Sequence, residues 1–450
     1  MEEFLKEIAD ALWGYPMIIL LLGTHLYLTV LLRFPQLKIW TAIKLSVTKD
    51  KGSHGDVSQF ESLATALAAT IGTGNIIGVA TAIALGGPGA VLWCWFTGVF
   101  GIATKYAESL LSVKYRMKNE RGQMVGGPMY VLEKGLKMKW LGVLFAIFTV
   151  FATFGIGSTV QVNSIALLAN ETFGLPFHVT GIVVTLLVAV VILLGIKGIA
   201  KVCSYLVPFM AIFYIIGCLI ILIINAEYLP ETIGLIVRSA FTSEAVGGGF
   251  VGTTVLMTCR YGIARGLFSN ESGMGAAPIV SAATQTRNPV RQALVAASGT
   301  FWDTVVVCAL TGLVLVSTCI APNGIDATQG AALTHAAFGT IPVIGPLVLT
   351  VGIFTFAFST ILGWSYYGEK SMEYLFGYKA VLPFRLIYIV VVFLGSILNL
   401  SVVWTFSDIA NGLMCIPNLI AVLLLSKVLV SETKKYLWSG NLDAEEKNLE

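Results

Sequence analysis

The sequence contains few charged residues for its length. Asp, Glu, Lys and Arg make up only 12% of the 450 residues, about half of the usual share in soluble domains. Hydrophobic residues account for 56%, and the mean hydropathy is +0.84. Such a chain cannot build a water-facing surface of the necessary size, which excludes a soluble enzyme, a nucleic-acid-binding protein and a disordered scaffold. We therefore expect a polytopic membrane protein whose main solvent is the lipid bilayer.

Signatures of metal and catalytic sites are also missing. The seven cysteines are scattered and form no C-x-x-C pair, so we expect them to pack in the core rather than to form disulfides or bind metal. No H-E-x-x-H motif occurs, and none of the four histidines pairs with an acid inside an apolar segment. Because no reactive constellation is present, we do not expect an enzyme.

The sequence does contain eleven apolar segments that could each cross a bilayer. A hydrocarbon core of roughly 30 Å needs about 20 residues of helix, and the alternating pattern of a β-barrel is absent. We therefore expect an all-α protein with 11 transmembrane helices. They cover residues 14–33, 63–84, 89–112, 141–169, 178–196, 204–226, 257–285 (interrupted), 292–319, 341–364, 382–401 and 406–430.

Basic residues are distributed unevenly between the loops. If the N-terminus lies outside, the inner segments carry 23 of the 28 Lys and Arg residues, and the outer segments carry only Lys6 and Arg238. Cytoplasmic loops are enriched in Lys and Arg, so we expect a cell-membrane protein with its N-terminus outside and its C-terminus in the cytoplasm. The outer segment 231–254 is too long for a turn, and we expect a short surface helix there.

Two of the apolar segments contain G-x-G near their middle, where a membrane helix should avoid glycines. The second segment reads Ala69-Thr70-Ile71-Gly72-Thr73-Gly74-Asn75-Ile76, and the seventh reads Phe268-Ser269-Asn270-Glu271-Ser272-Gly273-Met274-Gly275-Ala276-Ala277-Pro278. A single G-x-G is more often a packing motif between close helices. Two of them, flanked by Asn75 and Glu271, favour broken helices.

The two breaks lie five helices apart. Because five is odd, the second broken helix runs through the bilayer in the opposite direction, which is typical of transporters built from inverted repeats. We expect an extra N-terminal helix with a basic loop (1–62), a first five-helix repeat (63–226), an outer connection (227–244), an inverted second repeat (245–430) and a cytoplasmic tail (431–450).

Unwound segments have a clear chemical use inside a membrane. Their peptide groups cannot be satisfied by lipid and must face an internal cavity. The N-terminus of a half-helix suits a carboxylate, whereas freed carbonyls suit an ammonium group or Na⁺. An amino acid carries both charges on one small body, so the pattern favours an amino acid carrier.

The same residues resemble the family of alanine or glycine:cation symporters. The resemblance rests on Ile71-Gly72-Thr73-Gly74-Asn75-Ile76-Ile77-Gly78-Val79-Ala80, on Gly86-Gly87-Pro88-Gly89-Ala90 and on Arg265-Gly266-Leu267-Phe268-Ser269-Asn270-Glu271-Ser272-Gly273-Met274-Gly275. It extends over most of the chain. The family belongs to the amino acid–polyamine–organocation superfamily, so the resemblance implies a LeuT-type fold and Na⁺- or H⁺-coupled uptake of alanine or glycine.

The resemblance also implies which residues bind the solute. The backbone of residues 71–74 would take the carboxylate, and carbonyls near residues 271–273 would face the ammonium group. Phe268 would close the pocket above a small side chain. Gln161 would add an amide to the pocket or, alternatively, form a hydrogen bond between helices. The solute site predicted in this way comprises Ile71, Gly72, Thr73, Gly74, Asn75, Gln161, Phe268, Glu271, Ser272, Gly273, Met274, Gly275 and Ala276.

The same resemblance implies two ion sites. A first Na⁺ would lie between carbonyls of Ala68 and Ile71 and the hydroxyls of Ser359 and Thr360, although these hydroxyls could instead bond to their own helix. A second Na⁺ would use Thr70, Asn75, Ser269 and Asp303. Many relatives of the fold have a neutral amide at the position of Asp303. An acid inside a membrane is functional by default, so Asp303 would bind Na⁺ or serve as a proton site.

Several further charged residues lie near the ends of the segments. We expect Arg265 and Asp408 to form an outer gate, with snorkelling to the interface as the alternative, and Glu271 could instead neutralise Arg265. We expect Lys105 and Glu108 to form a solvated pair at the membrane interface. Trp364 could reach the solute site, but packing is the simpler interpretation.

Two other functions compete with an amino acid symporter. A channel would need a continuous polar path, which two isolated breaks do not provide. A transporter of the same fold could couple to H⁺ or carry another small solute, and only the family resemblance argues against the other solute. The sequence indicates no oligomeric state.

Overall fold

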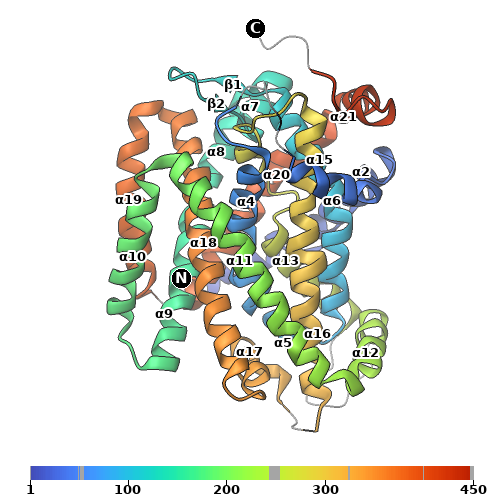
Figure 1. Ribbon diagram of the computed structural model, residues 1–450, viewed down its shortest axis with the longest axis vertical. Helices are drawn as coiled ribbons and strands as arrows, with labels where there is room; N and C mark the ends of the chain where they lie inside the picture. Colours follow the sequence, from blue (N-terminus) through green and yellow to red (C-terminus); the bar gives the residue numbers. More distant parts are fainter. Residues whose placement is uncertain are drawn as a thin grey trace.

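The computed structural model describes residues 2–48, 50, 55–242, 254–322, 325–398 and 400–445. These residues are almost entirely helical. One small antiparallel hairpin pairs β1 (Met117–Lys118) with β2 (Met124–Val125). The longest helices run roughly parallel to the long axis of the molecule, and the short elements gather at its two ends (Figure 1).

The helices fall into two successive sets along the chain. The first set comprises α1 (Glu2–Leu12), α2 (Tyr15–Leu31), α3 (Ile39–Ser46), α4 (Gln59–Thr70), α5 (Ile77–Gly86), α6 (Ala90–Lys114), α7 (Pro128–Tyr130), α8 (Lys139–Phe154), α9 (Val160–Phe173), α10 (Phe177–Ile192) and α11 (Gly195–Ile224). The second set comprises α12 (Leu229–Phe241), α13 (Val255–Asn270), α14 (Pro278–Ser281), α15 (Pro289–Thr300), α16 (Ala309–Ile320), α17 (Ala331–Gly339), α18 (Ile344–Phe376), α19 (Val381–Gly395), α20 (Leu400–Leu424) and α21 (Ser426–Thr433). Short π-helical segments join α8 to α9 (Gly155–Thr159) and α15 to α16 (Phe301–Cys308).

Seven helical segments in the described part of the chain are long and apolar enough to cross a membrane. They are Glu3–Leu31, Lys139–Phe173, Gly195–Ile224, Pro289–Ile320, Ile344–Phe376, Tyr378–Gly395 and Val403–Leu424. Each overlaps one of the spans expected from the sequence. The other four expected spans correspond to the interrupted pairs α4–α5 and α13–α14, to α6, and to the shorter apolar helix α10. The total of eleven therefore stays a prediction.

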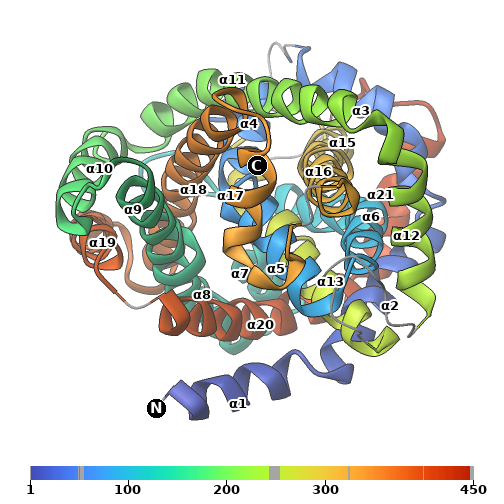
Figure 2. The same ribbon diagram turned by 90° about the horizontal axis from the view of Figure 1, so that it is seen from below.

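The first interrupted helix lies in the interior of the molecule. In the view along the long axis, α4 and α5 lie inside a ring that includes α6, α11, α18 and α20 (Figure 2). Nearly every residue of α4 and α15 is buried, whereas α10 and α19 expose rows of large apolar side chains such as Leu186, Val190 and Leu386. An apolar outer surface around a polar centre is the arrangement that a bilayer favours.

Several surface elements follow the sequence expectations only in part. The expected outer helix before the second break is present as α12, while residues 243–253 of that connection lie outside the described residues. The sequence analysis did not foresee α1, the hairpin β1–β2 or α17. Figure 2 shows α1 lying along the outside of the bundle beside α20.

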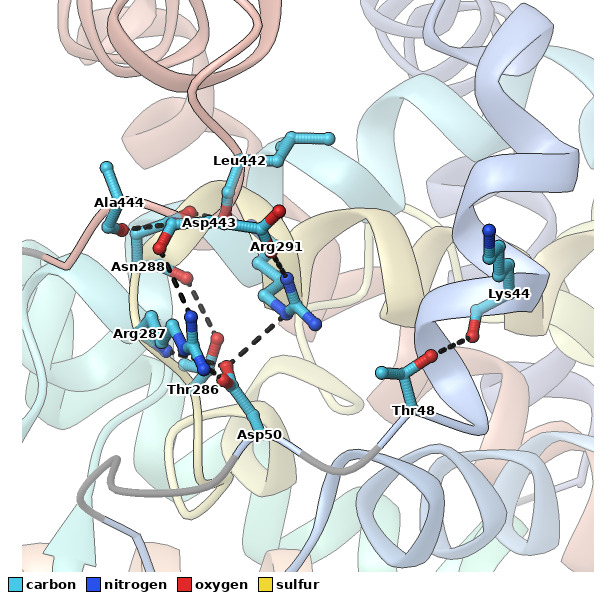
Figure 3. Close-up of polar contacts among 10 residues, drawn as sticks. All are labelled: Lys44, Thr48, Asp50, Thr286, Arg287, Asn288, Arg291, Leu442, Asp443 and Ala444. Atoms are coloured by element: carbon cyan, nitrogen blue, oxygen red, sulfur yellow. Dashed lines mark hydrogen bonds and ion pairs between the residues drawn. The ribbon is translucent and has the colours of Figure 1, made fainter.

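The C-terminal segment folds back onto the start of α15. Asn288 caps this helix by accepting the Arg291 N–H (3.0 Å), and its side-chain amide donates to the carbonyl of Leu442 (2.9 Å). Arg291 forms ion pairs with Asp443 (2.5 Å) and with Asp50 (3.3 Å). Three segments far apart in the sequence therefore meet at this end of the molecule (Figure 3).

The seven cysteines are all free thiols. Six of them are buried, and Cys259 on α13 is partly exposed. Their burial agrees with the interpretation of these residues as packing groups.

Candidate solute and ion sites

The first break interrupts the hydrogen-bond ladder of its helix at Gly72. Ile71 is the last residue to donate within α4, to Leu67 O (2.8 Å). The Gly72 N–H instead donates to Asn75 Oδ1 (2.9 Å), and the Thr73 N–H donates to Gln161 Oε1 (3.2 Å). Side chains thus replace the helical acceptors, because buried peptide groups must be paired.

Both glycines of the first break are tightly enclosed. A Cβ atom at Gly72 would lie 2.6 Å from Thr360 Oγ1 and 3.3 Å from Gln161 Oε1. A Cβ atom at Gly74 would lie 2.9 Å from Phe268 Cδ1, on the second broken helix. The first break is therefore in direct contact with the end of α13, just before the second break, and no larger residue fits at either glycine without movement of its neighbours.

The second break begins at Glu271, which adopts a left-handed conformation (φ 56°). Its N–H makes the last helical bond of α13, to Leu267 O (2.8 Å). The Ser272 N–H then donates to Oδ1 of Asn270 (2.9 Å), and Gly273 also has a positive φ of 100°. Helix α14 starts only at Pro278, so the chain between the half-helices is unwound.

The carboxylate of Glu271 faces Trp364 rather than Arg265. Trp364 Nε1 donates to Glu271 Oε1 (2.8 Å), and Glu271 Oε2 is buried without a hydrogen-bond partner among the described residues. Trp364 thus contacts the unwound segment, which the sequence analysis left open. The free carboxylate oxygen is an acceptor that an ammonium group could use.

A cluster of oxygen atoms links the first break to α18. Ser359 Oγ lies 3.2 Å from Ala68 O, and Thr360 Oγ1 lies 3.1 Å from Ala68 O and 3.4 Å from Ile71 O. Both hydroxyls also donate to Phe356 O of their own helix. The four residues named for the first ion site therefore adjoin one another. The ligands that they offer are neutral carbonyl and hydroxyl oxygens, which suit Na⁺.

A second polar cluster surrounds Asp303 in the π-helical segment between α15 and α16. Asn75 Nδ2 donates to Asp303 Oδ1 (2.8 Å), and Ser269 Oγ donates to Asp303 Oδ2 (2.8 Å). Thr304, which the sequence analysis did not name, adds a hydroxyl at 2.6 Å. Thr70 bonds instead to Leu67 O of its own helix (3.4 Å). Asp303 thus connects the first break to the end of α13.

The expected gate residues Arg265 and Asp408 form an ion pair between α13 and α20, at 3.2 Å. Next to it, the rings of Phe268 and Trp404 stack with centroids 4.9 Å apart. The Arg265 guanidinium lies 5.1 Å from the centre of the Trp404 ring. Because Phe268 also contacts Gly74, the stacked rings lie against the first break.

The interpretation of Lys105 and Glu108 as a solvated pair is wrong. The two residues are only 3% and 2% exposed, and α6 continues beyond them to Lys114. Glu108 Oε1 accepts the Gly273 N–H (2.9 Å) and a hydrogen bond from Asn418 (2.5 Å). The sequence analysis missed Asn418, although an amide directly after a proline inside an apolar segment was a usable signal.

The remaining residues of the predicted solute site differ in what they face. Met274 and Ala276 are fully buried. Gly275 has a positive φ of 79°, and a Cβ atom there would meet Pro128 (2.6 Å) and Asn418 (2.8 Å). Gln161 accepts from the Thr73 N–H and donates to Ile156 O of its own segment. The hydrogen bond between helices is therefore present, and the role of Gln161 in the solute pocket stays a prediction.

Comparison with known proteins identifies the family. A sequence profile of the sodium:alanine symporter family matches residues 1–449. The chain belongs to the sodium:alanine symporter family. It is 50% identical to the sodium/alanine symporter AgcS of Methanococcus maripaludis over 442 residues, which cover 96% of this chain and 97% of AgcS. It is also 34% identical to the probable sodium/glutamine symporter GlnT of Bacillus subtilis, over 97% of this chain and 91% of that protein.

A solved structure agrees on the fold of this sodium:alanine symporter family member. The crystal structure of MhsT in complex with L-phenylalanine matches with a TM-score of 0.62 at 15% identity, over 87% of this chain and 96% of MhsT. The chain therefore has the expected LeuT-type fold, and it is a multi-pass membrane transporter rather than an enzyme. Na⁺ is the coupling ion of the family.

Proposed function

We propose that this protein couples inward Na⁺ movement to the uptake of alanine or glycine across the cell membrane. The observation that carries the proposal is the contact between the first unwound segment and the last turn of α13, which leads into the second break, next to the oxygen cluster of Ser359 and Thr360. Peptide groups at the breaks suit the two charges of an amino acid, and neutral oxygens suit Na⁺. Coupling then arises because solute and ion share the residues of the first break.

The tight enclosure of the breaks supports a small solute. Phe268 and Trp364 place aromatic rings directly beside the unwound segments, and Trp404 stacks on Phe268. We propose that Phe268 limits the length of the side chain that the pocket accepts. We further propose that residues 71–74 bind the carboxylate and that Glu271 and Ser272 lie next to the ammonium group.

We propose that transport proceeds by alternating access. The bundle of α4–α5, α6, α13–α14 and α15–α16 would rock against the other helices, and the Arg265–Asp408 pair would open and close the outer path. The hairpin β1–β2 and the C-terminal segment lie at the end that carries most of the basic loops, and α12 and α17 lie at the opposite end (Figure 1). The basic end is proposed to face the cytoplasm, with the N-terminus outside.

Calorimetry and uptake measurements test this function. Titration of the purified protein with alanine and glycine should give binding in Na⁺ buffer and none in choline buffer. Proteoliposomes should accumulate alanine when a Na⁺ gradient is imposed, and glutamine should compete poorly. Uptake driven by a pH gradient without Na⁺ would instead support H⁺ coupling, and strong competition by glutamine would contradict the proposed solute.

A further inference from the structure

Both peptide groups of Gly273 in the second break are bound by side chains from other helices. The Gly273 N–H donates to Glu108 Oε1 (2.9 Å), and the Gly273 carbonyl accepts from Asn418 Nδ2 (2.8 Å). The same Nδ2 also donates to Glu108 Oε1 (2.5 Å). The three residues form a closed triangle of hydrogen bonds around one peptide position.

The triangle joins three separate parts of the molecule. Glu108 comes from α6, Gly273 from the second break and Asn418 from α20, directly after Pro417 inside that helix. The Asn418 side chain also lies along Gly275, where a Cβ atom would come within 2.8 Å of Asn418 Oδ1. The two peptide units on either side of the Gly273 Cα atom are thus each held by a hydrogen bond to a side chain.

The carboxyl group of Glu108 lies buried inside the helix bundle, which is unusual for an acidic side chain. A carboxylate inside a membrane protein is costly unless it is paired or hydrogen-bonded. Lys105 lies three residues earlier, on the same face of α6. Its Nζ atom is buried, and neither Lys105 Nζ nor Glu108 Oε2 has a hydrogen-bond partner in the described part of the chain. The bonds of Glu108 are therefore directed to the unwound segment and to Asn418.

We propose that Glu108 and Asn418 are positioning residues that fix the second break in the conformation that receives the solute. A segment without its own helical bonds can adopt many conformations, and ordering it during binding would weaken affinity. A carboxylate that accepts from Gly273 and an amide that donates to Gly273 remove this freedom beforehand. The inference rests on the proposed solute site, because it assigns a role to residues that do not touch the solute.

A double variant that exchanges the carboxylate of Glu108 and the amide of Asn418 distinguishes a positioning role from a simple link between α6 and α20. Asn418→Asp removes the donor to Gly273 O, and we expect alanine to bind about tenfold more weakly or worse. In the double variant Glu108→Gln/Asn418→Asp, the new amide can donate to the new carboxylate, so the link between α6 and α20 is restored. No donor then faces Gly273 O. We expect the double variant to recover thermal stability but not alanine affinity, and recovery of affinity would overturn the proposal.

A second pair of variants tests the other bond of Gly273. Glu108→Gln keeps an oxygen that accepts from the Gly273 N–H and should retain affinity within about threefold, whereas Glu108→Leu should lose about tenfold or more. Size-exclusion chromatography and melting curves in detergent would verify that each variant is folded. Equal affinity of the Gln and Leu variants would contradict a role for this hydrogen bond.

Hydrogen–deuterium exchange tests the inference independently of the transported solute. The peptide that contains Gly273 should exchange faster in Asn418→Asp and Glu108→Leu than in the wild type, while peptides from α10 should not change. Unchanged exchange at Gly273 would refute the positioning role even if alanine binds. If the wild type fails to bind alanine but the variants exchange faster, the proposed function fails and the positioning role stands.

Discussion

Replacement of Thr360 by valine tests the first ion site with little change in shape. The substitution removes the hydroxyl that lies 3.1 Å from Ala68 O and 3.4 Å from Ile71 O. Loss of one neutral hydrogen bond should lower the stability of the ion-free protein by about 1 kcal/mol. Loss of an oxygen that contacts a cation should cost about 1.5–3 kcal/mol of binding free energy, which corresponds to roughly 10- to 150-fold weaker Na⁺ binding.

The matched control is Thr355→Val on the same helix. Thr355 is also buried, but its hydroxyl donates to Val351 O (2.6 Å) and Gly352 O (3.3 Å) of its own helix. We expect this variant to lose a similar amount of stability and to keep its Na⁺ affinity. The assay is calorimetric titration with alanine at a series of Na⁺ concentrations, combined with melting curves without Na⁺. Wild-type Na⁺ affinity in Thr360→Val, or an equal loss in both variants, would refute the assignment of the site.

Three further substitutions and one control probe the solute site and the gate. Gly74→Ala places a methyl group 2.9 Å from Phe268 and should abolish alanine uptake, whereas Gly234→Ala, which meets no atom within 4 Å, should leave uptake unchanged. Phe268→Leu should admit longer side chains, and competition by a series of amino acids would measure this; a variant still restricted to alanine and glycine would argue against Phe268 as the limit of the pocket. Asp408→Asn weakens the ion pair with Arg265 and should speed release of bound alanine to the outside by about threefold, as expected for loss of roughly 0.7 kcal/mol; unchanged efflux in a counterflow assay would remove the pair from the gate.

The breaks could be predicted because their cause is local. Glycine lowers the stability of a helix wherever it occurs, so paired glycines in two apolar segments mark the places where the ladder fails. The polar residues beside them, Asn75 and Glu271, were also visible in the sequence. The contact between Asn75 and Asp303, which lie more than 200 residues apart, followed only from the family resemblance.

The environment of α6 could not be predicted because it depends on distant chain segments. Lys105 and Glu108 lie near the end of an apolar segment, where charged side chains usually reach water. In the structure, Gly126 of the following loop packs against Ser112, and Arg116 donates to the carbonyl of Thr284 between α14 and α15. These contacts cover the end of α6, and no pattern within α6 indicates them.

The partial exposure of Cys259 makes the unmodified chain suitable for site-selective labelling. The other six thiols are buried, so a maleimide dye should react first at this position in the folded protein. Cys259 precedes Arg260, which pairs with Asp10 of the surface helix α1, and it lies on the same helix as Arg265. A fluorophore attached there would report on movements of the gate helix without the prior removal of native cysteines.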